Sequence, residues 1–280
     1  MTPTPHPYRG AVIAFATMHG KEHLARGPFH TILGATVLGV AGIDTDQFGT
    51  FAGDIPRTLP PRETARAKAR LGIRTAGLTA GLASEGSFTT EYGWSTRHNE
   101  LVLFLDEDRG IEVVESRTAS FPLPPGRHIL TSAQALSYAT SLGFPHQGVI
   151  VQAHHDHGSH AHKDTHSPAE LEITVNRLLD QNVPVSVLPD YRAHRSPARA
   201  DILRDLCSRM ARRLSTPCPG CRSPGYGRVK TIPGLPCGTC GQPTHLPAAD
   251  IHACSTCDTT HTRPRTSTLA DPQWCETCNP

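Results

Sequence analysis

Residues 218–240 read CPGCRSPGYGRVKTIPGLPCGTC, a stretch with two Cys-x-x-Cys pairs separated by glycine and proline. Two further pairs of the same spacing follow before the end of the chain. Two thiolates three residues apart can bind one metal ion from a tight turn, and two such pairs complete a tetrahedral shell. The tail therefore predicts two structural Zn²⁺ ions, held by Cys218, Cys221, Cys237, Cys240, Cys254, Cys257, Cys275 and Cys278.

The gaps between the pairs favour one order of pairing. Fifteen residues separate the first pair from the second and seventeen the third from the fourth, whereas the middle gap is thirteen. Zinc ribbons commonly place about 15–20 residues between their two pairs, so we expect sequential sites in preference to interleaved ones. Disulfides or a redox dithiol are the alternatives, but four equal spacings with loop-forming residues between them favour metal.

The tail from 215 to 280 is rich in Pro, Gly and Thr and has few large apolar side chains. Metal-ligand free energy must then replace the missing hydrophobic core. We therefore expect a double zinc-ribbon domain at 215–280 after an α/β domain at 1–214. The ninth cysteine, Cys207, lies beside the apolar stripe of a predicted helix and is interpreted as a core residue.

In the first 214 residues, short apolar runs alternate with segments of helical periodicity, which predicts a mixed, mostly parallel sheet with helices on both faces. A hairpin is expected at 106–110. The last helix should begin with Ser196 as N-cap and Pro197 as its first residue. The expected strands are 11–16, 37–43, 75–82, 101–105, 111–115, 148–152 and 183–188, and the expected helices are 28–35, 61–71, 131–142, 167–181 and 196–214.

Polar clusters follow several of these strands, at 17–22, 44–51, 84–88 and 190–195. Ligands of open α/β sheets bind outside the carboxyl ends of the strands, where loops from different strands converge. The four clusters therefore predict one site in a strand-end crevice. The site residues would be His19, Lys21 and Glu22 for catalysis, Lys21, Arg192, Arg195, Ser84 and Ser87 for substrate binding, and Asp44, Asp46, Glu85 and Asp190 for a metal.

Carboxylate oxygens suit Mg²⁺ or Mn²⁺, lysine and arginine suit an anionic group such as phosphate, and His19 has the ordinary pKa of an acid/base residue. The alternative for each carboxylate is a loop cap or a salt bridge to one of the same basic residues. For His19 it is a hydrogen-bonded structural role. A serine nucleophile would lack the usual G-x-S-x-G elbow.

Six histidines crowd into residues 154–166, after the predicted strand at 148–152. Imidazole binds Zn²⁺, Ni²⁺ or Cu²⁺, so a metal-binding loop is one interpretation. The other is an exposed insertion that binds such metals only adventitiously.

The formal net charge is only +2, but ten Arg and Lys lie between Arg192 and Lys230 against Asp201 and Asp205. This basic stripe fits either phosphate contacts or a solvated helix face. The run at 11–16 is too short for a signal peptide, and no stretch is apolar enough to span a membrane. We therefore expect a cytoplasmic protein with reduced cysteines.

Several short words together resemble a bacterial family classed as a domain of unknown function. They are His19-Gly20-Lys21-Glu22, Asp44-Thr45-Asp46 with Phe48-Gly49-Thr50-Phe51, the stretch GLASEGSF at 81–88, Asp190 to His194, and Gly234-Leu235-Pro236-Cys237. The resemblance implies that the N-terminal loops and the cysteine tail belong to one architecture. It implies no reaction.

Two functional classes follow from the sequence. The first is a divalent-metal-dependent hydrolase or phosphoryl-transfer enzyme that acts on an anionic small molecule or nucleotide in the crevice. The second is a nucleic-acid or protein-binding module that uses the basic stripe and the zinc ribbons.

Overall fold

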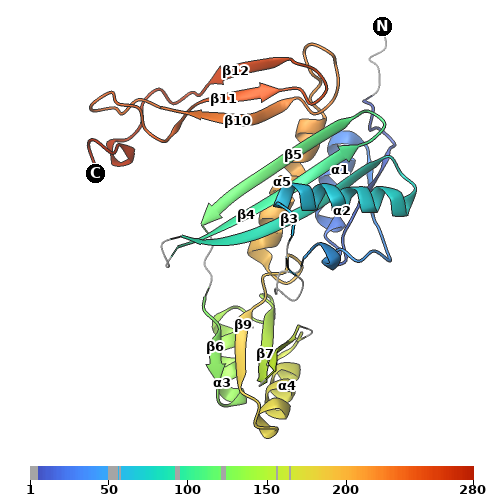
Figure 1. The fold of residues 1–280 in the computed structure, drawn as a ribbon, viewed down its shortest axis with the longest axis vertical. Coiled ribbons are helices and arrows are strands. Elements are labelled where there is room, and N and C mark those ends of the chain that lie inside the picture. The colour runs from blue at the N-terminus through green and yellow to red at the C-terminus, as the bar shows by residue number, and fades with distance from the viewer. Residues whose placement is uncertain are drawn as a thin grey trace.

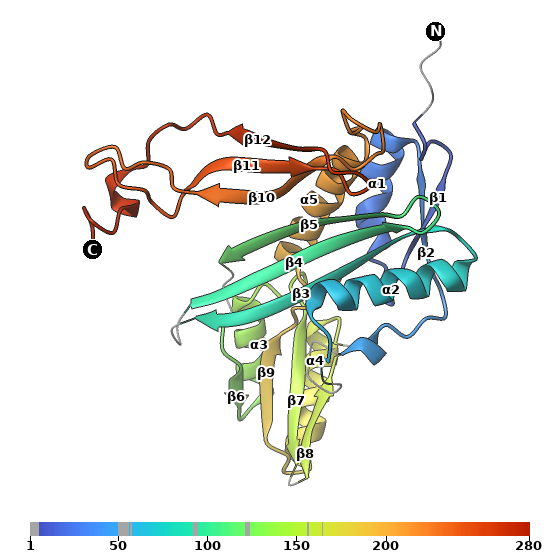
Figure 2. The same ribbon diagram turned by 45° about the horizontal axis from the view of Figure 1, so that its top comes forward.

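The computed structural model describes residues 6–49, 56, 58–91, 95–120, 124–155, 157–163 and 165–280 (Figure 1). It has a five-stranded sheet, a separate four-stranded sheet and a three-stranded sheet near the C-terminus. Seen from a second direction, the five-stranded sheet lies between the other two (Figure 2). The predicted α/β class is confirmed, and the C-terminal cysteines form two groups of four, which is consistent with the predicted zinc-ribbon tail.

The five-stranded sheet is half parallel and half antiparallel, in the order β2-β1-β3-β4-β5. β1 runs parallel to β2 and β3, whereas β3, β4 and β5 form an antiparallel meander. The hairpin predicted at 106–110 is confirmed. The strands are β1 (Val12–Phe15), β2 (Thr36–Gly39), β3 (Ala80–Glu91), β4 (Ser95–Asp106) and β5 (Ile111–Ser120).

Helices cover both faces of this sheet, as predicted. α1 (Glu22–Leu33) and α5 (Pro197–Leu214) pack on one face, and α2 (Pro61–Ala76) packs on the other. Successive side chains of a strand point to opposite faces. Leu82 therefore joins the cluster under α1 and α5, whereas its neighbour Ala83 joins the cluster under α2.

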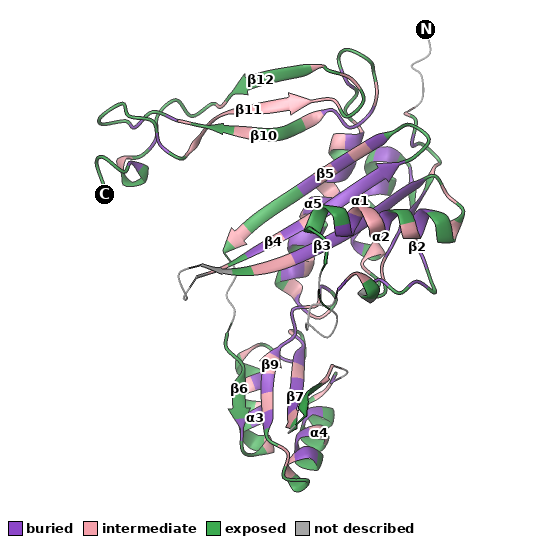
Figure 3. Cartoon of the chain, viewed as in Figure 1, coloured by how far each residue is buried: buried purple, intermediate pink, exposed green. Residues whose placement is uncertain are grey.

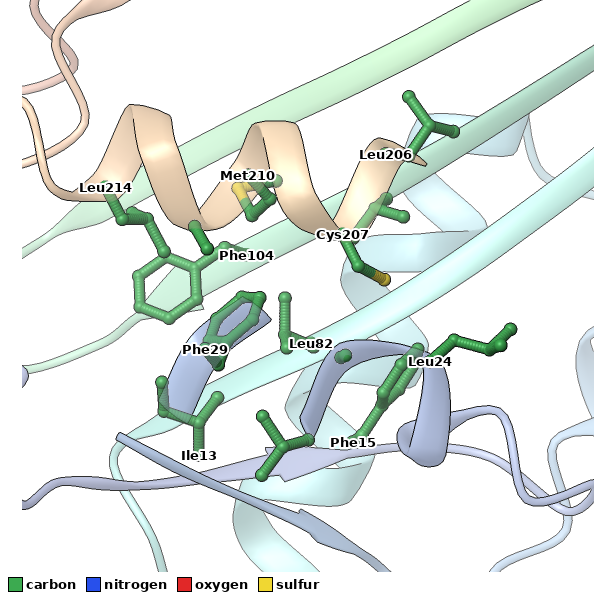
Figure 4. Close-up of a cluster of buried hydrophobic side chains, with 14 of the residues drawn as sticks. Ile13, Phe15, Leu24, Phe29, Leu82, Phe104, Leu206, Cys207, Met210 and Leu214 are labelled. Carbon is green, nitrogen blue, oxygen red and sulfur yellow. The ribbon is translucent and has the colours of Figure 1, made fainter. Parts of the chain in front are cut away.

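The main core lies between α5, α1 and the sheet (Figure 4). Leu206, Met210 and Leu214 recur at three to four residues along α5 and are fully buried, which is the helical periodicity that the sequence predicted. Cys207 is buried in the same cluster, and burial raises the pKa of its thiol to about 12. Its predicted role as a core residue is confirmed.

The four-stranded sheet forms a second part with its own apolar cluster, and its strand order is β6-β9-β7-β8. Figure 1 shows it beyond the end of the five-stranded sheet, with α3 and α4 beside it. All its strand pairs are antiparallel. Its elements are β6 (Arg127–Ile129), α3 (Ser132–Ser141), β7 (Val149–His155), β8 (Gly158–His162), α4 (Pro168–Asp180) and β9 (Val185–Pro189).

The expectation of a mostly parallel sheet in the first 214 residues is wrong. The described residues of that part form two sheets, and most of their strand pairs are antiparallel. The error at β7 and β9 has a clear cause. A helix between two strands normally indicates a parallel crossover. Here β8, which lies in the histidine-rich segment, reverses the direction of the chain after β7. α4 then reverses it once more, so β9 runs antiparallel to β7.

Some element bounds also differ from the prediction. α2 continues to Ala76, so residues 75–79 precede β3 instead of starting it. α1 begins at Glu22, six residues before the predicted start, and Pro28 lies inside it. The predicted start of α5, with Ser196 at the N-cap and Pro197 first, is confirmed, although the Ser196 hydroxyl makes no capping hydrogen bond.

The C-terminal sheet is formed by β10 (Gly227–Pro233), β11 (Pro247–Ala253) and β12 (Thr260–Pro264), all antiparallel. A single-turn helix, η2 (Pro272–Trp274), follows. Figure 3 shows that these strands are mostly exposed or half-buried, unlike those of the five-stranded sheet. The tail therefore lacks an apolar core of its own, as expected for a domain stabilised by metal. Within the described ranges no helix is both long enough and apolar enough to cross a membrane.

Candidate functional site

The first metal centre joins the first and third cysteine pairs, Cys218/Cys221 and Cys254/Cys257. The Sγ atoms of Cys218 and Cys257 are 3.7 Å apart, and those of Cys221 and Cys254 are 3.6 Å apart. Four sulfurs about 2.3 Å from one zinc ion in a tetrahedron would lie about 3.8 Å apart. The four thiols are therefore spaced for a structural zinc ion.

The second centre joins the second and fourth pairs, Cys237/Cys240 and Cys275/Cys278. The Sγ atoms of Cys237 and Cys278 are 3.9 Å apart, and those of Cys240 and Cys275 are 3.5 Å apart. This geometry also matches four-thiolate zinc. All eight predicted ligands thus fall into two groups of four that could each hold a metal ion.

The sequential pairing favoured by the gap lengths is wrong, because the two centres are interleaved. The antiparallel sheet explains this. β10 carries the chain away from Cys221, β11 brings it back to Cys254, and β12 carries it away again. Each gap contains one strand, so alternate cysteine pairs lie at the same end of the sheet. The three gaps between successive cysteine pairs are similar in length, and each is long enough for one strand. This was the sequence signal for interleaved pairing.

The two cysteine turns that begin the metal centres, at 218–223 and 237–242, have the same backbone structure. In the first, the Cys218 amide donates to the Ser223 carbonyl at 2.8 Å, and Arg222 has a φ of 66°. In the second, the Cys237 amide donates to the Gln242 carbonyl at 2.8 Å, and Gly241 has a φ of 71°. A residue with positive φ after the second cysteine therefore closes each turn, and Arg222 adopts this conformation without being glycine.

A second candidate site lies where the loop after β1 meets β3. β1 pairs with β3 only as far as Phe15 and Leu82, and β3 continues to Glu91. Residues 84 and 85 are therefore beside the chain that leaves β1. The Lys21 Nζ donates to Ser84 Oγ at 3.2 Å, which joins two of the four predicted loops.

The other two loops also contact the loop after β1. The Thr45 amide lies 3.1 Å from the Met18 Sδ, and the rings of His19 and His194 stack with centroids 4.4 Å apart. A groove of about 370 Å³ lies beside this histidine pair and is lined by His23, His194 and residues of the first turns of α5. Contacts between side chains and backbone thus connect all four loops.

A buried ion pair lies next to Lys21. Arg199 Nε is 2.7 Å from Glu100 Oε2, and both side chains are almost completely buried. His98 contacts the same carboxylate oxygen at 3.0 Å. Burial would raise the pKa of Glu100, but Arg199 and then the His98 hydrogen bond hold it down to about 2. Gly86 leaves the necessary space, because a Cβ there would lie 2.1 Å from an Arg199 nitrogen.

Lys21 itself has an unusual environment. Its residue is half-buried, but its ammonium is enclosed, so burial and then the nearby Arg199 lower its pKa to about 8. Glu100 and Glu85 oppose this shift less strongly than burial does. Within the described residues, no carboxylate lies close enough to Lys21 for a salt bridge. We refer to Lys21, Ser84, Glu100, Arg199 and the His19/His194 pair as the strand-end site.

Two of the predicted metal-binding carboxylates are engaged in salt bridges. Glu85 forms a buried salt bridge of 2.7 Å with Lys68 of α2, and Asp190 is fully buried and pairs with Arg192 at 2.7 Å. Asp44 is exposed, and the side chain of Asp46 lies outside the described residues. Among the described side chains, the only groups of three or more potential metal ligands are the cysteine tetrads.

Three of the remaining predicted residues, Glu22, Arg192 and Arg195, make side-chain contacts. Glu22 lies 3.3 Å from Arg26. Ser87 is three positions from Ser84 on β3 and so faces the opposite side of the sheet. Arg192 donates to the Lys163 carbonyl, and Arg195 donates to the Thr165 carbonyl at 2.5 Å. The two arginines thus bind the backbone at Lys163 and at Thr165.

Sequence reasoning did not select Glu100, His98, Arg199 or Lys68. The alternation of His98, Glu100, Val102 and Phe104 was the available signal, because it places two polar residues on the core-facing side of a strand. Arg199 was counted in the basic stripe although its first-turn position on α5 directs it to β4.

The histidine-rich segment forms the hairpin of β7 and β8 and the chain after it. His154 contacts the Ser159 and Ser186 hydroxyls at 3.0 Å each, and the rings of His160 and His162 lie edge to face. In the described part of the segment, no three imidazoles come together as a metal site.

A family model described as "Domain of unknown function (DUF6671)" matches residues 68–280. This chain belongs to that family. The match begins at Lys68 of α2 and includes both cysteine tetrads, Ser84, Glu100 and Arg199, whereas the loop that carries His19 and Lys21 precedes it. The predicted resemblance to a family of unknown function is confirmed. No curated protein matches the chain.

Proposed function

We propose that the strand-end site binds an anionic small molecule, such as one that carries a phosphate group, and hydrolyses it or transfers its phosphoryl group. The observation that supports this most directly is the enclosed ammonium of Lys21, which contacts the Ser84 hydroxyl at 3.2 Å and forms no salt bridge with a described carboxylate. A buried cation without a counter-charge is costly. A bound anion would supply that charge.

The balance of charge around Lys21 supports the same proposal. Arg199 and Lys68 lower the pKa of Lys21, and Glu100 and Glu85 raise it. Three cations thus lie near two carboxylates, each of which already has a cationic partner. The surplus positive charge belongs to Lys21, and it favours a phosphate or carboxylate ligand.

The histidine pair offers proton transfer beside that anion. Burial and then His19 lower the pKa of His194 to about 4, so its imidazole is neutral near pH 7. A neutral imidazole can accept a proton, and in this proposal its stacked partner His19 would be the acid/base residue. Lys21 would neutralise developing charge, and Ser84 would hydrogen-bond to the substrate.

A divalent cation remains a separate part of the proposal. Mg²⁺ or Mn²⁺ would use the carboxylates of Asp44 and Asp46, whereas Glu85 and Asp190 form salt bridges with Lys68 and Arg192. The surplus cation at Lys21 makes the anion the better-supported ligand.

The Lys21→Met variant should test the anion site. We expect pyrophosphate to raise the melting temperature of the wild-type protein and to bind the variant about 10 to 100 times more weakly, because a hydrogen bond to a charged group is worth about 1.5–3 kcal/mol. Arg74→Met is the control, since it also removes one positive charge and Arg74 is exposed on α2, away from both sites. Equal affinities of wild type and Lys21→Met would refute the anion site.

Titration calorimetry with Mn²⁺ tests the metal role. Asp44→Asn should weaken Mn²⁺ binding and barely change the melting temperature, because Asp44 is exposed and is not a core residue. Asp108→Asn, in the exposed turn between β4 and β5, is the control. If Asp44→Asn binds Mn²⁺ as tightly as the control, Asp44 is not a ligand.

A further inference from the structure

A basic groove separates the five-stranded sheet from the C-terminal sheet, at the opposite end of α5 from the strand-end site. Its larger part has a volume of about 720 Å³ and its smaller part about 340 Å³. Both parts are lined by Arg209 and Arg213 of α5, Arg228 of β10 and Glu115 of β5. The two parts therefore form one continuous surface, which reaches Cys254 of the first metal centre.

Acidic residues neutralise only some of the cations in this groove. Glu115 pairs with Arg209 at 2.6 Å and with Arg213 at 3.1 Å. Asp250 lies 3.9 Å from Arg228 and 2.9 Å from Arg265. Three further lining cations are exposed and have no ion pair within the part of the chain that the structure describes, namely Arg212, Lys230 and Arg263.

Arg212, Lys230 and Arg263 line the same groove as Arg209, Arg213 and Arg228. This clustering of cations creates a positive local field, which would attract a polyanion.

The two walls of the groove are held together by one side chain. Arg213 of α5 donates to the Val114 carbonyl of β5 at 3.1 Å and to the Arg228 carbonyl of β10 at 3.0 Å. Gly227 makes room for it, because a Cβ there would lie 3.0 Å from the Arg213 side chain. The free cations on α5 and on the C-terminal sheet are thus presented in a fixed arrangement.

The lining has the chemistry of a nucleic-acid interface more than that of a protein interface. Protein interfaces rely on exposed aromatic and apolar anchors. Here the one aromatic ring of Phe, Tyr or Trp type in the described lining, Tyr226, is buried, and its hydroxyl contacts His261 at 2.8 Å. Protein surfaces that bind nucleic acid are polar and strongly positive.

We propose that this groove binds the phosphate backbone of a nucleic-acid strand through Arg212, Lys230 and Arg263. The groove is separate from the strand-end site, because Arg199 and Arg212 lie thirteen positions apart on α5, which corresponds to about 20 Å along a helix. Backbone contacts carry no base information, so binding is independent of sequence.

The test is fluorescence anisotropy with a labelled 20-nucleotide RNA of random sequence, using the full chain with its zinc. We expect affinity to fall steeply with salt, because each phosphate contact releases counterions. The triple variant Arg212→Glu, Lys230→Glu and Arg263→Glu should bind at least about 100-fold more weakly and show a shallower salt dependence by about two to three units of slope. Single-stranded and double-stranded DNA of equal length show which form fits the groove best.

The control variant carries Arg74→Glu, Arg127→Glu and Arg177→Glu, which are exposed on α2, β6 and α4. It changes the net charge by the same amount and should bind RNA within about threefold of wild type. Zinc content and circular dichroism must match wild type in both variants. The proposal is overturned if both variants lose affinity equally, if no nucleic acid binds at 100 mM salt, or if polyglutamate displaces RNA at equal charge concentration.

Discussion

Substitution of Cys237 by Ser should release one of two zinc ions and leave the other bound. Cys237 is a member of the second tetrad only, and structural zinc contributes about 10–16 kcal/mol to the folding of small zinc domains. The distal end of the C-terminal sheet should therefore unfold, whereas the first tetrad and the α/β parts keep their structure. Metal analysis should give one zinc per chain for the variant and two for the wild type, each purified without a histidine tag.

The thiols exposed by this variant distinguish the two pairing schemes. Interleaved centres predict that alkylation labels Cys240, Cys275 and Cys278. Sequential centres would instead expose Cys218, Cys221 and Cys240. Cys207→Ser is the control, because Cys207 is buried in the core beside α5 and belongs to neither tetrad. Labelling of Cys218 and Cys221 would contradict the interleaved arrangement, and disulfides in the untreated protein would contradict zinc.

The Glu100→Leu variant should be strongly destabilised, because it leaves the Arg199 guanidinium buried without its partner. Removal of one member of a buried ion pair costs about 3–5 kcal/mol. The double variant Glu100→Leu with Arg199→Met should regain much of this loss, since no isolated charge remains. Urea unfolding at pH 7, monitored by circular dichroism, measures the free energy of unfolding of both variants.

The choice of pH follows from the sign of the Glu100 shift. Its folded pKa of about 2 is below its ordinary value of 4.5, so the pair contributes its full stability above pH 4.5 and loses it as the pH falls toward 2. Asp201→Leu with Arg204→Met is a surface control, because that pair is exposed on α5 and such pairs contribute little. A Glu100→Leu cost below about 1 kcal/mol would contradict the buried pair.

Local patterns predicted the elements better than their connections. The apolar stripe of α5, the Asp106–Gly110 hairpin and the eight ligands were readable because each depends on neighbouring residues. Strand direction and cysteine pairing depend on contacts across the chain. β8 was not recognised as a strand because its polar sequence, Gly158–His162, carries no apolar alternation.

The candidate site shows the same limit. The sequence placed Lys21 and Ser84 in converging loops, and the structure joins them directly. For Asp190 the sequence left open a metal role or a salt bridge to one of the same basic residues, and the structure pairs Asp190 with Arg192. The sequence did not indicate that Glu85 would pair with Lys68 of α2. Which carboxylates remain available is decided by packing, and no single motif encodes it.

Lys21 is an enclosed cation without a carboxylate partner among the described residues, and its pKa is the most direct test of this environment. NMR titration of the Lys21 ε-methylene carbon, assigned by comparison with Lys21→Met, should give a midpoint at about 8 instead of 10.5. Because the folded value is lowered, Lys21 should favour unfolding below pH 8 and do so progressively less as the pH rises from 8 to 10.5. Pyrophosphate should raise the midpoint by stabilising the charged form. A midpoint near 10.5 that pyrophosphate does not change would contradict the account.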